Sequence, residues 1–183
     1  MNHIYSMSLL REYIQNLITE KIETDQLSTM IAIYPTDDAI KQIVKFRNTL
    51  DIPSDVRVIP PEELHCTIRY WKGDRKLEDI LPFVNSLESK SISAKATKLE
   101  ALGDSIVILL DSKELNSLFS KIDNGIQKHG IPPSDFPDYK AHISLYGGDK
   151  AQEVPSKKIP FDTLSLDGVK MVNEDDEVFW SSL

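Results

Sequence analysis

The sequence has one cysteine, Cys66, among its 183 residues. A single cysteine excludes an internal disulfide framework and a zinc site built on a cysteine cluster, and it favours a reducing, cytoplasmic setting. Long apolar runs are also absent, so no segment is predicted to span a bilayer. The first five residues lack the basic and then apolar pattern of a secretory signal. These absences favour a cytoplasmic protein with no membrane partner.

Positive charge is scarce as well. Lys and Arg together number 21 against 29 Asp and Glu, which gives a formal net charge of −8. Proteins that bind duplex DNA usually carry wide basic surfaces, so duplex DNA is not expected as a ligand. A small anion needs only a few local donors in a cleft, and is compatible with an acidic protein. The length suits one compact domain or one domain of two lobes.

Hydrophobic periodicity predicts a mixture of helices and strands. The expected helices cover residues 6–24, 75–89 and 114–129. Another is capped by Thr36 or Asp37 and carries Ile40, Ile43, Val44 and Leu50. The expected strands cover residues 30–34, 64–70, 91–99, 106–110 and 141–146, with one or two more between 161 and 180. Turns are predicted at Gly103-Asp104 and, as a hairpin, at Asp167-Gly168. The order suggests a roughly duplicated α+β unit over residues 29–183, after an amphipathic helix within residues 1–28.

Two of the predicted strands carry the same pattern, a histidine followed two residues later by a hydroxyl. The first strand has His65 and Thr67, and the second has His142 and Ser144. Side chains two residues apart on a strand point to the same face. Each strand is therefore expected to present an imidazole and a hydroxyl side by side.

The same alternation assigns further residues to these two faces. It places Arg69 beside the first pair, and Lys140 and Tyr146 beside the second. The opposite faces are mainly apolar and are expected to pack under helices, with Cys66 as a small hydrophobic residue. The polar faces are then expected to line a cleft, where Arg69 and Lys140 suit an anionic substrate.

These residue types fit the cleavage of a phosphodiester. One group must take a proton from the attacking oxygen, and another must donate a proton to the leaving oxygen. Histidine serves both roles because its pKa of about 6.5 lies near neutral pH. The hydroxyls of Thr67 and Ser144 can donate hydrogen bonds to the non-bridging phosphate oxygens. Such a site needs no metal, and the sequence has no His-x-x-x-His spacing of the kind found in zinc sites.

A lone histidine is more often a hydrogen-bonded structural residue, but two motifs in corresponding places favour catalysis. The pair resembles the LigT-like 2H phosphoesterase superfamily over most of the chain after about residue 29. The resemblance implies a bilobal α+β fold with two antiparallel sheets facing a central cleft and helices outside. It also implies metal-independent action on nucleotide phosphodiesters, without a cofactor. His65, Thr67, His142 and Ser144 match the superfamily motif one by one and are the expected catalytic residues.

Within this superfamily the chain is similar to phage anti-CBASS nucleases, which hydrolyse the cyclic oligonucleotide messengers of a bacterial defence system. Their pattern has a tyrosine near the end of the first strand, matched by Tyr34, and a C-terminal glutamate and tryptophan, matched by Glu177 and Trp180. Aromatic rings offer surfaces on which bases stack, and a carboxylate accepts a hydrogen bond from an amino group or a ribose hydroxyl. The acidic residues at positions 174–176 are alternative candidates for the C-terminal glutamate of this pattern. Each aromatic residue also has a structural interpretation, as a core residue or a C-terminal anchor.

The leading hypothesis is a phosphodiesterase acting on cyclic di- or trinucleotides, in the host cytoplasm if the protein is of phage origin. Arg69, Tyr146, Tyr34, Glu177 and Trp180 are the expected substrate contacts. One alternative is RNA-end processing, as a 2′,3′-cyclic phosphodiesterase or a 2′–5′ RNA ligase-like enzyme. Another is a non-catalytic protein that binds cyclic nucleotides. The sequence leaves open which histidine is the base, and whether the N-terminal helix packs on the domain or pairs two chains into a homodimer.

Overall fold

The computed structural model describes most of the chain from residue 28 onward. The expected helix over residues 6–24, the first part of the expected helix over 75–89, and Glu177 lie outside the described residues. The described residues are 28–52, 56–72, 81–84, 86–87, 90–128, 138–148, 154–155, 157–173 and 178–181.

Within the described residues, the predicted helices and strands occur in the predicted order, and a short strand and a 3₁₀ turn that were not predicted lie between Arg57 and Glu63. In chain order they are β1 (Ser28–Pro35), α2 (Asp37–Arg47), β2 (Arg57–Val58), the 3₁₀ turn η1 (Pro61–Glu63), β3 (Cys66–Lys72), α3 (Leu81–Val84), β4 (Ile92–Leu102), β5 (Ser105–Asp111), α4 (Lys113–Lys128), β6 (His142–Gly147), β7 (Thr163–Asn173) and β8 (Val178–Ser181). The turn predicted at Gly103-Asp104 joins β4 to β5 as expected. The α+β class is therefore confirmed.

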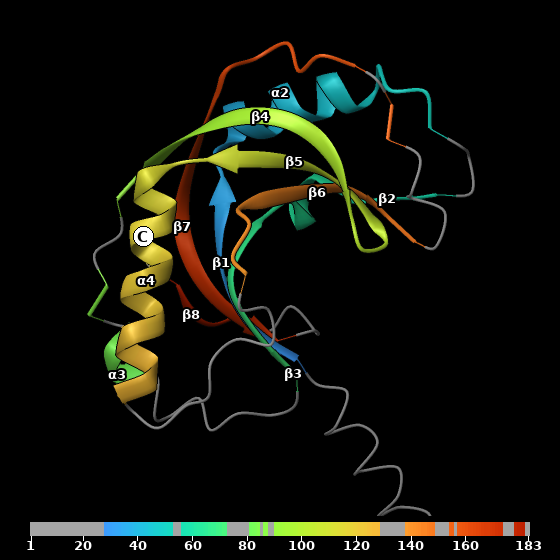
Figure 1. Cartoon of the computed structure of the whole chain (residues 1–183). Helices are drawn as coiled ribbons and strands as arrows, with labels where there is room; N and C mark the ends of the chain where they lie inside the picture. The colour runs from blue at the N-terminus through green and yellow to red at the C-terminus, as the bar shows by residue number, and fades with distance from the viewer. Residues whose placement is uncertain are drawn as a thin grey trace, which may run out of the picture.

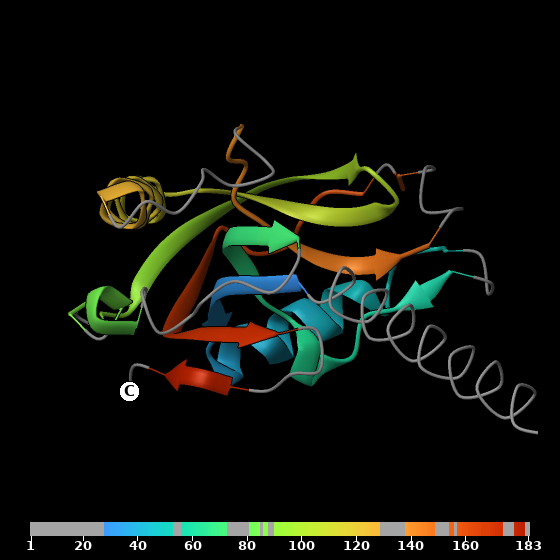
Figure 2. The same cartoon turned by 90° about the horizontal axis from the view of Figure 1, so that it is seen from below.

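The eight strands that the structure describes form one antiparallel sheet. Their order is β2-β6-β5-β4-β7-β1-β3, and β8 pairs with β7. The expectation of two separate sheets is corrected, because Ile92–Lys95 of β4 pair with β7 whereas Lys95–Leu102 pair with β5. Figure 1 shows β4 and β7 curving strongly through the molecule, and Figure 2 shows the same curvature from below. The two halves are thus continuous through shared strands.

Helices α2 and α4 pack against different parts of this sheet, α2 on β1 and β7, and α4 on β3 and β4. Helix α2 begins after Thr36, whose hydroxyl accepts a hydrogen bond from the amide of Ala39 at 3.4 Å. Helix α4 buries Leu115, Ile122 and Ile126, which share one helical face. Helix α4 therefore supports the strand that carries the first motif.

Strand β3 contains a β-bulge directly after its motif. Ala32 of β1 pairs with Thr67, whereas the residue before Ala32 pairs with Arg69, so Ile68 is an extra residue on β3. A bulge shifts the alternation of side chains by one position. Ile68 and Arg69 are therefore both buried, and Tyr70 joins Thr67 in lining a pocket.

Strand β6 carries a bulge at the corresponding place. Ser144 pairs with Val107 of β5, whereas Tyr146 pairs with the residue before Val107, so Leu145 is the extra residue. As in β3, the extra residue stands three positions after the motif histidine. Leu145 and Tyr146 are both buried as a result. The two motif strands thus share the same irregularity at the same position relative to the motif histidine.

The hairpin turn predicted at Asp167-Gly168 is wrong. Strand β7 runs through these residues, and its pairing with β1 shifts here, because Ala32 pairs with Lys170 whereas Tyr34 pairs with Asp167. Gly168 has a φ of 62°, a left-handed conformation that glycine adopts without steric cost. The glycine therefore marks a bulge within a strand, which sequence alone did not distinguish from a turn.

Candidate active site

The curvature of the sheet brings the two motif strands together. Strands β3 and β6 are in contact, although four strands separate them in the order of hydrogen bonding. Cys66, which follows His65, places its thiol against the backbone of His142. The same sulfur lies 3.8 Å from the hydroxyl of Tyr139. The two motifs therefore lie side by side.

Cys66 itself is a core residue, as predicted. The side chain is fully buried, and burial raises the pKa of the thiol from 9.0 to about 11, while contacts with Tyr139 and the backbone of His142 act in the opposite direction. Burial also raises the pKa of the Tyr139 hydroxyl. Both groups therefore stay protonated at neutral pH, and Cys66 is not an activated nucleophile.

The two motif histidines are oriented by the same kind of hydrogen bond. Nδ1 of His65 lies 2.7 Å from the carbonyl oxygen of Glu63, and Nδ1 of His142 lies 2.6 Å from the carbonyl oxygen of Lys140. A carbonyl oxygen only accepts hydrogen bonds, so Nδ1 carries the proton in both rings. Nε2 then holds the lone pair when the ring is neutral, which is the tautomer that a general base at Nε2 requires.

The motif hydroxyls face different charges across the sheet. Thr67 is half-buried, and its row of paired residues continues through Ala32 to Lys170. The equivalent row from Ser144, also half-buried, ends two strands away at Glu100. Directly paired residues in an antiparallel sheet share a face. A cation therefore shares the face of Thr67, and an anion shares the face of Ser144.

Glu100 is held by two lysines. Its carboxylate lies 2.5 Å from the ammonium of Lys98 and 3.6 Å from that of Lys140. These contacts, with Lys98 the stronger, lower the pKa of the Glu100 carboxyl. Lys140 lines the pocket beside the motifs, as expected from its strand position, and it reaches the pocket while paired with Glu100.

A pocket of about 500 Å³ opens beside the motifs. One residue of each motif lines it, Thr67 from the first and His142 from the second. Its other lining residues are Ile68, Tyr70, Leu102, Gly103, Asp138, Tyr139 and Lys140. The pocket thus combines catalytic candidates with aromatic and apolar walls, the composition typical of a small-molecule site.

Tyr34 lies next to the first motif. Its ring centroid is 6.0 Å from that of His65, and the ammonium of Lys170 lies 4.5 Å from the centre of the Tyr34 ring. The side chain is half-buried. This position agrees with a residue that contacts substrate, and its role in binding a base stays a prediction.

The expected position of Arg69 on the cleft face is wrong. Arg69 is 2% exposed and forms an ion pair with Asp123 of α4. Its guanidinium lies 5.7 Å from the ring centre of Trp71 and 5.5 Å from that of Phe119. The bulge in β3 is the cause, because it turns Arg69 toward the helix and brings Tyr70 to the pocket.

The expected position of Tyr146 beside Ser144 is also wrong, again because of a bulge. The bulge in β6 turns it inward, where it is 6% exposed. Its hydroxyl donates a hydrogen bond to the carbonyl oxygen of Arg47 at 3.1 Å. Tyr146 therefore ties β6 to the end of α2 and does not share the face of Ser144.

Two expected substrate contacts lie in the C-terminal part of the chain. The backbone of Trp180 pairs with Met171 as part of β8. Glu177 is outside the described residues. The roles of these two residues in substrate binding stay predictions.

Three residues at the site escaped the sequence analysis: Tyr70, Tyr139 and Lys170. Strict alternation from His65 would place Tyr70 on the apolar face, because it does not account for the bulge at Ile68. Tyr139 precedes the second motif strand, where no periodicity applies, and Lys170 reaches Tyr34 only through the pairing of β7 with β1. The glycine at position 168 was the one signal of irregular pairing nearby.

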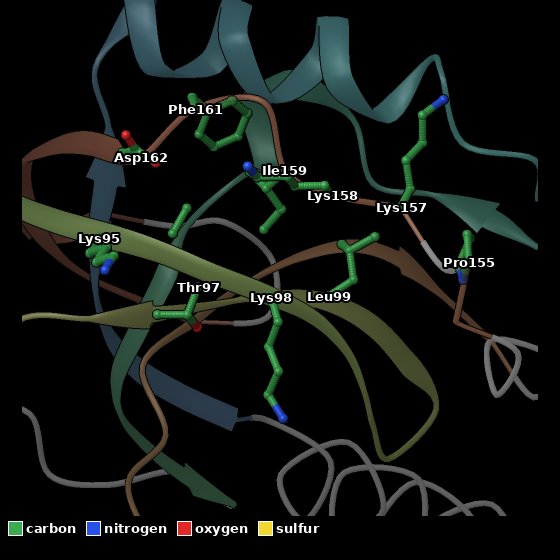
Figure 3. Close-up of a pocket in the computed structure, with 11 residues that line it drawn as sticks. Lys95, Thr97, Lys98, Leu99, Pro155, Lys157, Lys158, Ile159, Phe161 and Asp162 are labelled. Carbon is green, nitrogen blue, oxygen red and sulfur yellow. The ribbon is translucent and has the colours of Figure 1, made fainter.

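A second pocket, of about 460 Å³, lies at the edge of β4 beside residues 157–162. Figure 3 shows the four lysines that line it, Lys95, Lys98, Lys157 and Lys158. Lys98 also bonds to Glu100, which in turn pairs with Lys140 of the first pocket. A chain of charged groups thus connects the two pockets.

Among the described residues, no group of three or more His, Cys, Asp or Glu side chains could hold a metal ion. No helix within the described ranges is long and apolar enough to cross a membrane.

The fold is that of LigT-like phosphoesterases whose structures are known. The chain is similar to the crystal structure of a phosphoesterase (TM-score 0.64, 15% identity, covering 85% of this chain and 94% of that chain). It is also similar to E. coli LigT complexed with NADP+ (TM-score 0.63, 14% identity, 84% and 96%). A third similar structure is the MHV ns2 PDE domain (TM-score 0.58, 14% identity, 80% and 99%).

The chain belongs to the family described as Anti-CBASS protein Acb1, which it matches over residues 28–175. No curated protein matches the sequence. Family membership confirms the predicted class of activity, a phosphodiesterase that degrades cyclic nucleotides.

Proposed function

We propose that this protein cleaves a phosphodiester of a cyclic di- or trinucleotide by acid–base catalysis with His65 and His142, without a metal ion. The matched orientation of the two rings supports this proposal, because each Nδ1 donates to a backbone carbonyl and Nε2 serves proton transfer. The contact between β3 and β6 gives the second support, since it allows both imidazoles to act on one substrate.

The proposed reaction moves two protons. One imidazole takes the proton from a ribose 2′-hydroxyl, whose oxygen attacks the adjacent phosphorus. The other, protonated imidazole donates its proton to the 5′-oxygen as the bond from phosphorus to that oxygen breaks. The hydroxyls of Thr67 and Ser144 donate hydrogen bonds to the non-bridging oxygens, where negative charge develops. The first product carries a 2′,3′-cyclic phosphate, which water can open with the two histidines in exchanged roles.

Product analysis by mass tests this proposal. The protein is incubated in EDTA with a panel of cyclic di- and trinucleotides, and a linear product or a 2′,3′-cyclic phosphate end is expected. His65→Ala and His142→Ala should each lower the rate by about 10²–10⁴-fold, the range typical of one general acid or base. His129→Ala, outside both motifs, is the matched control. Full activity in either motif variant would refute the assignment, and recovery of intact ligand would favour the non-catalytic binding protein.

The lysine pocket supports a second candidate, the processing of RNA ends. A linear RNA needs cations beyond the scissile phosphate, and Lys95, Lys157 and Lys158 line a pocket connected to the site through Lys98 and Glu100. Rates on a cyclic dinucleotide and on an RNA ending in a 2′,3′-cyclic phosphate separate the candidates. If the RNA is the better substrate and Lys157→Ala lowers only its rate, RNA-end processing is the function.

The remaining predictions concern partners and location. We propose that the helix predicted within residues 1–28 pairs two chains into a homodimer, and that the protein acts in the cytoplasm. The apolar stripe over residues 6–24 supports the pairing. Light scattering on the full chain and on Leu10→Glu with Leu17→Glu tests it. A dimer mass that falls to the monomer mass in the double variant is expected, and a monomeric wild type would refute the pairing.

A further inference from the structure

We propose that Lys170 binds the scissile phosphate of the substrate beside the hydroxyl of Thr67, and so supplies the positive charge of the active site. The inference rests on the proposed function of this site and adds a residue that lies outside both motifs. The negative charge of a phosphodiester grows as the attacking oxygen bonds to phosphorus. A cation beside it therefore stabilises the transition state more than the ground state.

The two cations that belong to the motif strands are already paired with carboxylates. Arg69 is buried and forms an ion pair with a carboxylate of α4. Lys140 lies 3.6 Å from the carboxylate of Glu100. Among the described residues, no carboxylate forms an ion pair with Lys170. The charge of Lys170 is therefore available to a bound anion.

Lys170 and Thr67 stand in one row of the sheet. Ala32 of β1 pairs with Thr67 on one side and with Lys170 on the other. Two strand spacings separate the backbones of Thr67 and Lys170, which is roughly 10 Å. The residue between them contributes only a methyl group. A phosphate bound to the Thr67 hydroxyl therefore lies within reach of the long side chain of Lys170.

The three residues of this row face away from the hydrophobic core. Successive side chains on a strand point to opposite faces, and directly paired residues share a face. The residues on either side of each member of the row belong to the core: Cys66, Ile68, Ile31, Ile33, Val169 and Met171. Lys170 therefore shares the face of Thr67, on which the motif presents its chemical groups.

The ring of Tyr34 holds the ammonium of Lys170 near the first motif. Nζ of Lys170 lies 4.5 Å from the centre of the Tyr34 ring, and the same ring lies 6.0 Å from that of His65. A cation–π contact positions an ammonium without neutralising its charge. Lys170 is also half-buried, so its charge acts more strongly than it would in bulk water.

Phosphate binding tests the inference separately from catalysis. The full chain is titrated with inorganic phosphate, and the ring-proton NMR signals of His65 and His142 report binding at the motifs. Wild type should show saturable shifts. Lys170→Met should weaken phosphate by about 10- to 100-fold, the value of one hydrogen bond between charged groups. Lys170→Gln, a second neutral variant, should behave alike, and Lys170→Arg, which keeps the charge, should recover most of the affinity.

Lys41→Met is the matched control for the loss of one lysine. Lys41 lies on α2, where it pairs with Asp38, and its replacement should leave phosphate binding unchanged. Two results would overturn the inference. One is the absence of saturable shifts in wild type, and the other is equal phosphate affinity in wild type and both neutral variants of Lys170.

Rates on a cyclic dinucleotide test the contribution to the transition state. Lys170→Met should lower kcat by about 10²–10³-fold with a smaller change in KM, because the negative charge grows during the reaction. Lys170→Arg should restore most of the rate, and Lys41→Met should retain it. A loss of rate that Lys170→Arg does not restore would show that the side chain has only a structural role.

Phosphorothioate substrates locate the contact. Sulfur is a weaker hydrogen-bond acceptor than oxygen, so one of the two diastereomers at the scissile phosphate should react more slowly with wild type. That loss should shrink in Lys170→Met, because the contact that sulfur weakens is already absent. Equal losses in wild type and Lys170→Met for both diastereomers would overturn the contact.

The proposed function and the role of Lys170 fail in different ways. If wild type leaves every cyclic nucleotide intact while Lys170→Met still weakens phosphate, the catalytic proposal fails and the phosphate contact stands. If wild type cleaves a cyclic dinucleotide and Lys170→Met binds phosphate and cleaves as wild type does, the catalytic proposal stands and the role of Lys170 fails.

Discussion

The guanidinium of Arg69 and the carboxylate of Asp123 form an ion pair that fastens the first motif strand to helix α4. The Arg69 side chain is 1% exposed, whereas that of Asp123 is 24% exposed. Burial lowers the pKa of Arg69, and Asp123 opposes that shift. The Asp123 carboxylate thus compensates the charge of a guanidinium buried on the opposite face of the strand from Thr67. The buried guanidinium needs this counter-charge more than the partly exposed carboxylate needs the guanidinium.

Removing Asp123 should therefore lower the free energy of unfolding more than removing Arg69 does. Asp123→Leu leaves the buried guanidinium without its counter-charge and should lower the free energy of unfolding by about 3–5 kcal/mol. Arg69→Met should cost less, because the remaining carboxylate has access to water. The double variant should lie closer to wild type than Asp123→Leu does. Urea unfolding of the four proteins measures this, and additive losses would contradict the coupling.

Alkaline pH should destabilise the protein through Cys66. The pKa of the thiol is raised from 9.0 to about 11 in the folded state, so the unfolded chain loses this proton first. The free energy of unfolding is therefore unaffected by this group below pH 9 and falls by about 3 kcal/mol as the pH rises from 9 to 11. Thermal unfolding from pH 8 to 11 should show a steeper decline for wild type than for Cys66→Ala. Parallel curves would show that the thiol does not titrate as described.

The bulge in β7 depends on glycine at position 168. Its φ of 62° disfavours any residue with a Cβ, so Gly168→Ala should lower the free energy of unfolding by about 1–2 kcal/mol. Gly147→Ala is the matched control, because its added Cβ would meet neighbours only at 3.8 Å. Chemical denaturation compares the two variants. Equal stability would contradict the left-handed conformation at this glycine.

The motif hydroxyls should affect the rate more than the affinity. Thr67→Val keeps the shape of the side chain and removes the donor, and kcat should fall by about 10²–10³-fold with little change in KM. Ser144→Ala should behave alike. Thr97→Val, on β4 away from the motifs, serves as the control for a lost threonine hydroxyl. A rise in KM with unchanged kcat would assign the hydroxyls to ground-state binding.

Sequence patterns predicted the class of fold because hydrophobic periodicity and turn residues act locally. The hairpin at Gly103-Asp104 and the buried face of α4 follow from such short-range rules. The pairing of β4 with both β5 and β7 could not be foreseen, since it depends on how a long strand bends. That long-range pairing is what merged the two expected sheets into one.

The same limit applies to the site. Two residues of each motif lie before the bulge, so alternation predicted a shared face for His65 and Thr67. Arg69 and Tyr146 lie after the bulges, and no local pattern marked an extra residue at Ile68 or Leu145. Predictions from alternation hold only as far as the strand stays regular.

The continuity of the sheet has a mechanical consequence. Strands β4 and β7 belong to both halves, so the halves cannot rotate about a linker as two plates would about a hinge. Any change in the gap between His65 and His142 must bend hydrogen-bonded strands, whose resistance is spread over many residues. The twist of the sheet therefore sets the distance between the two histidines before substrate binds, and changing that distance costs energy.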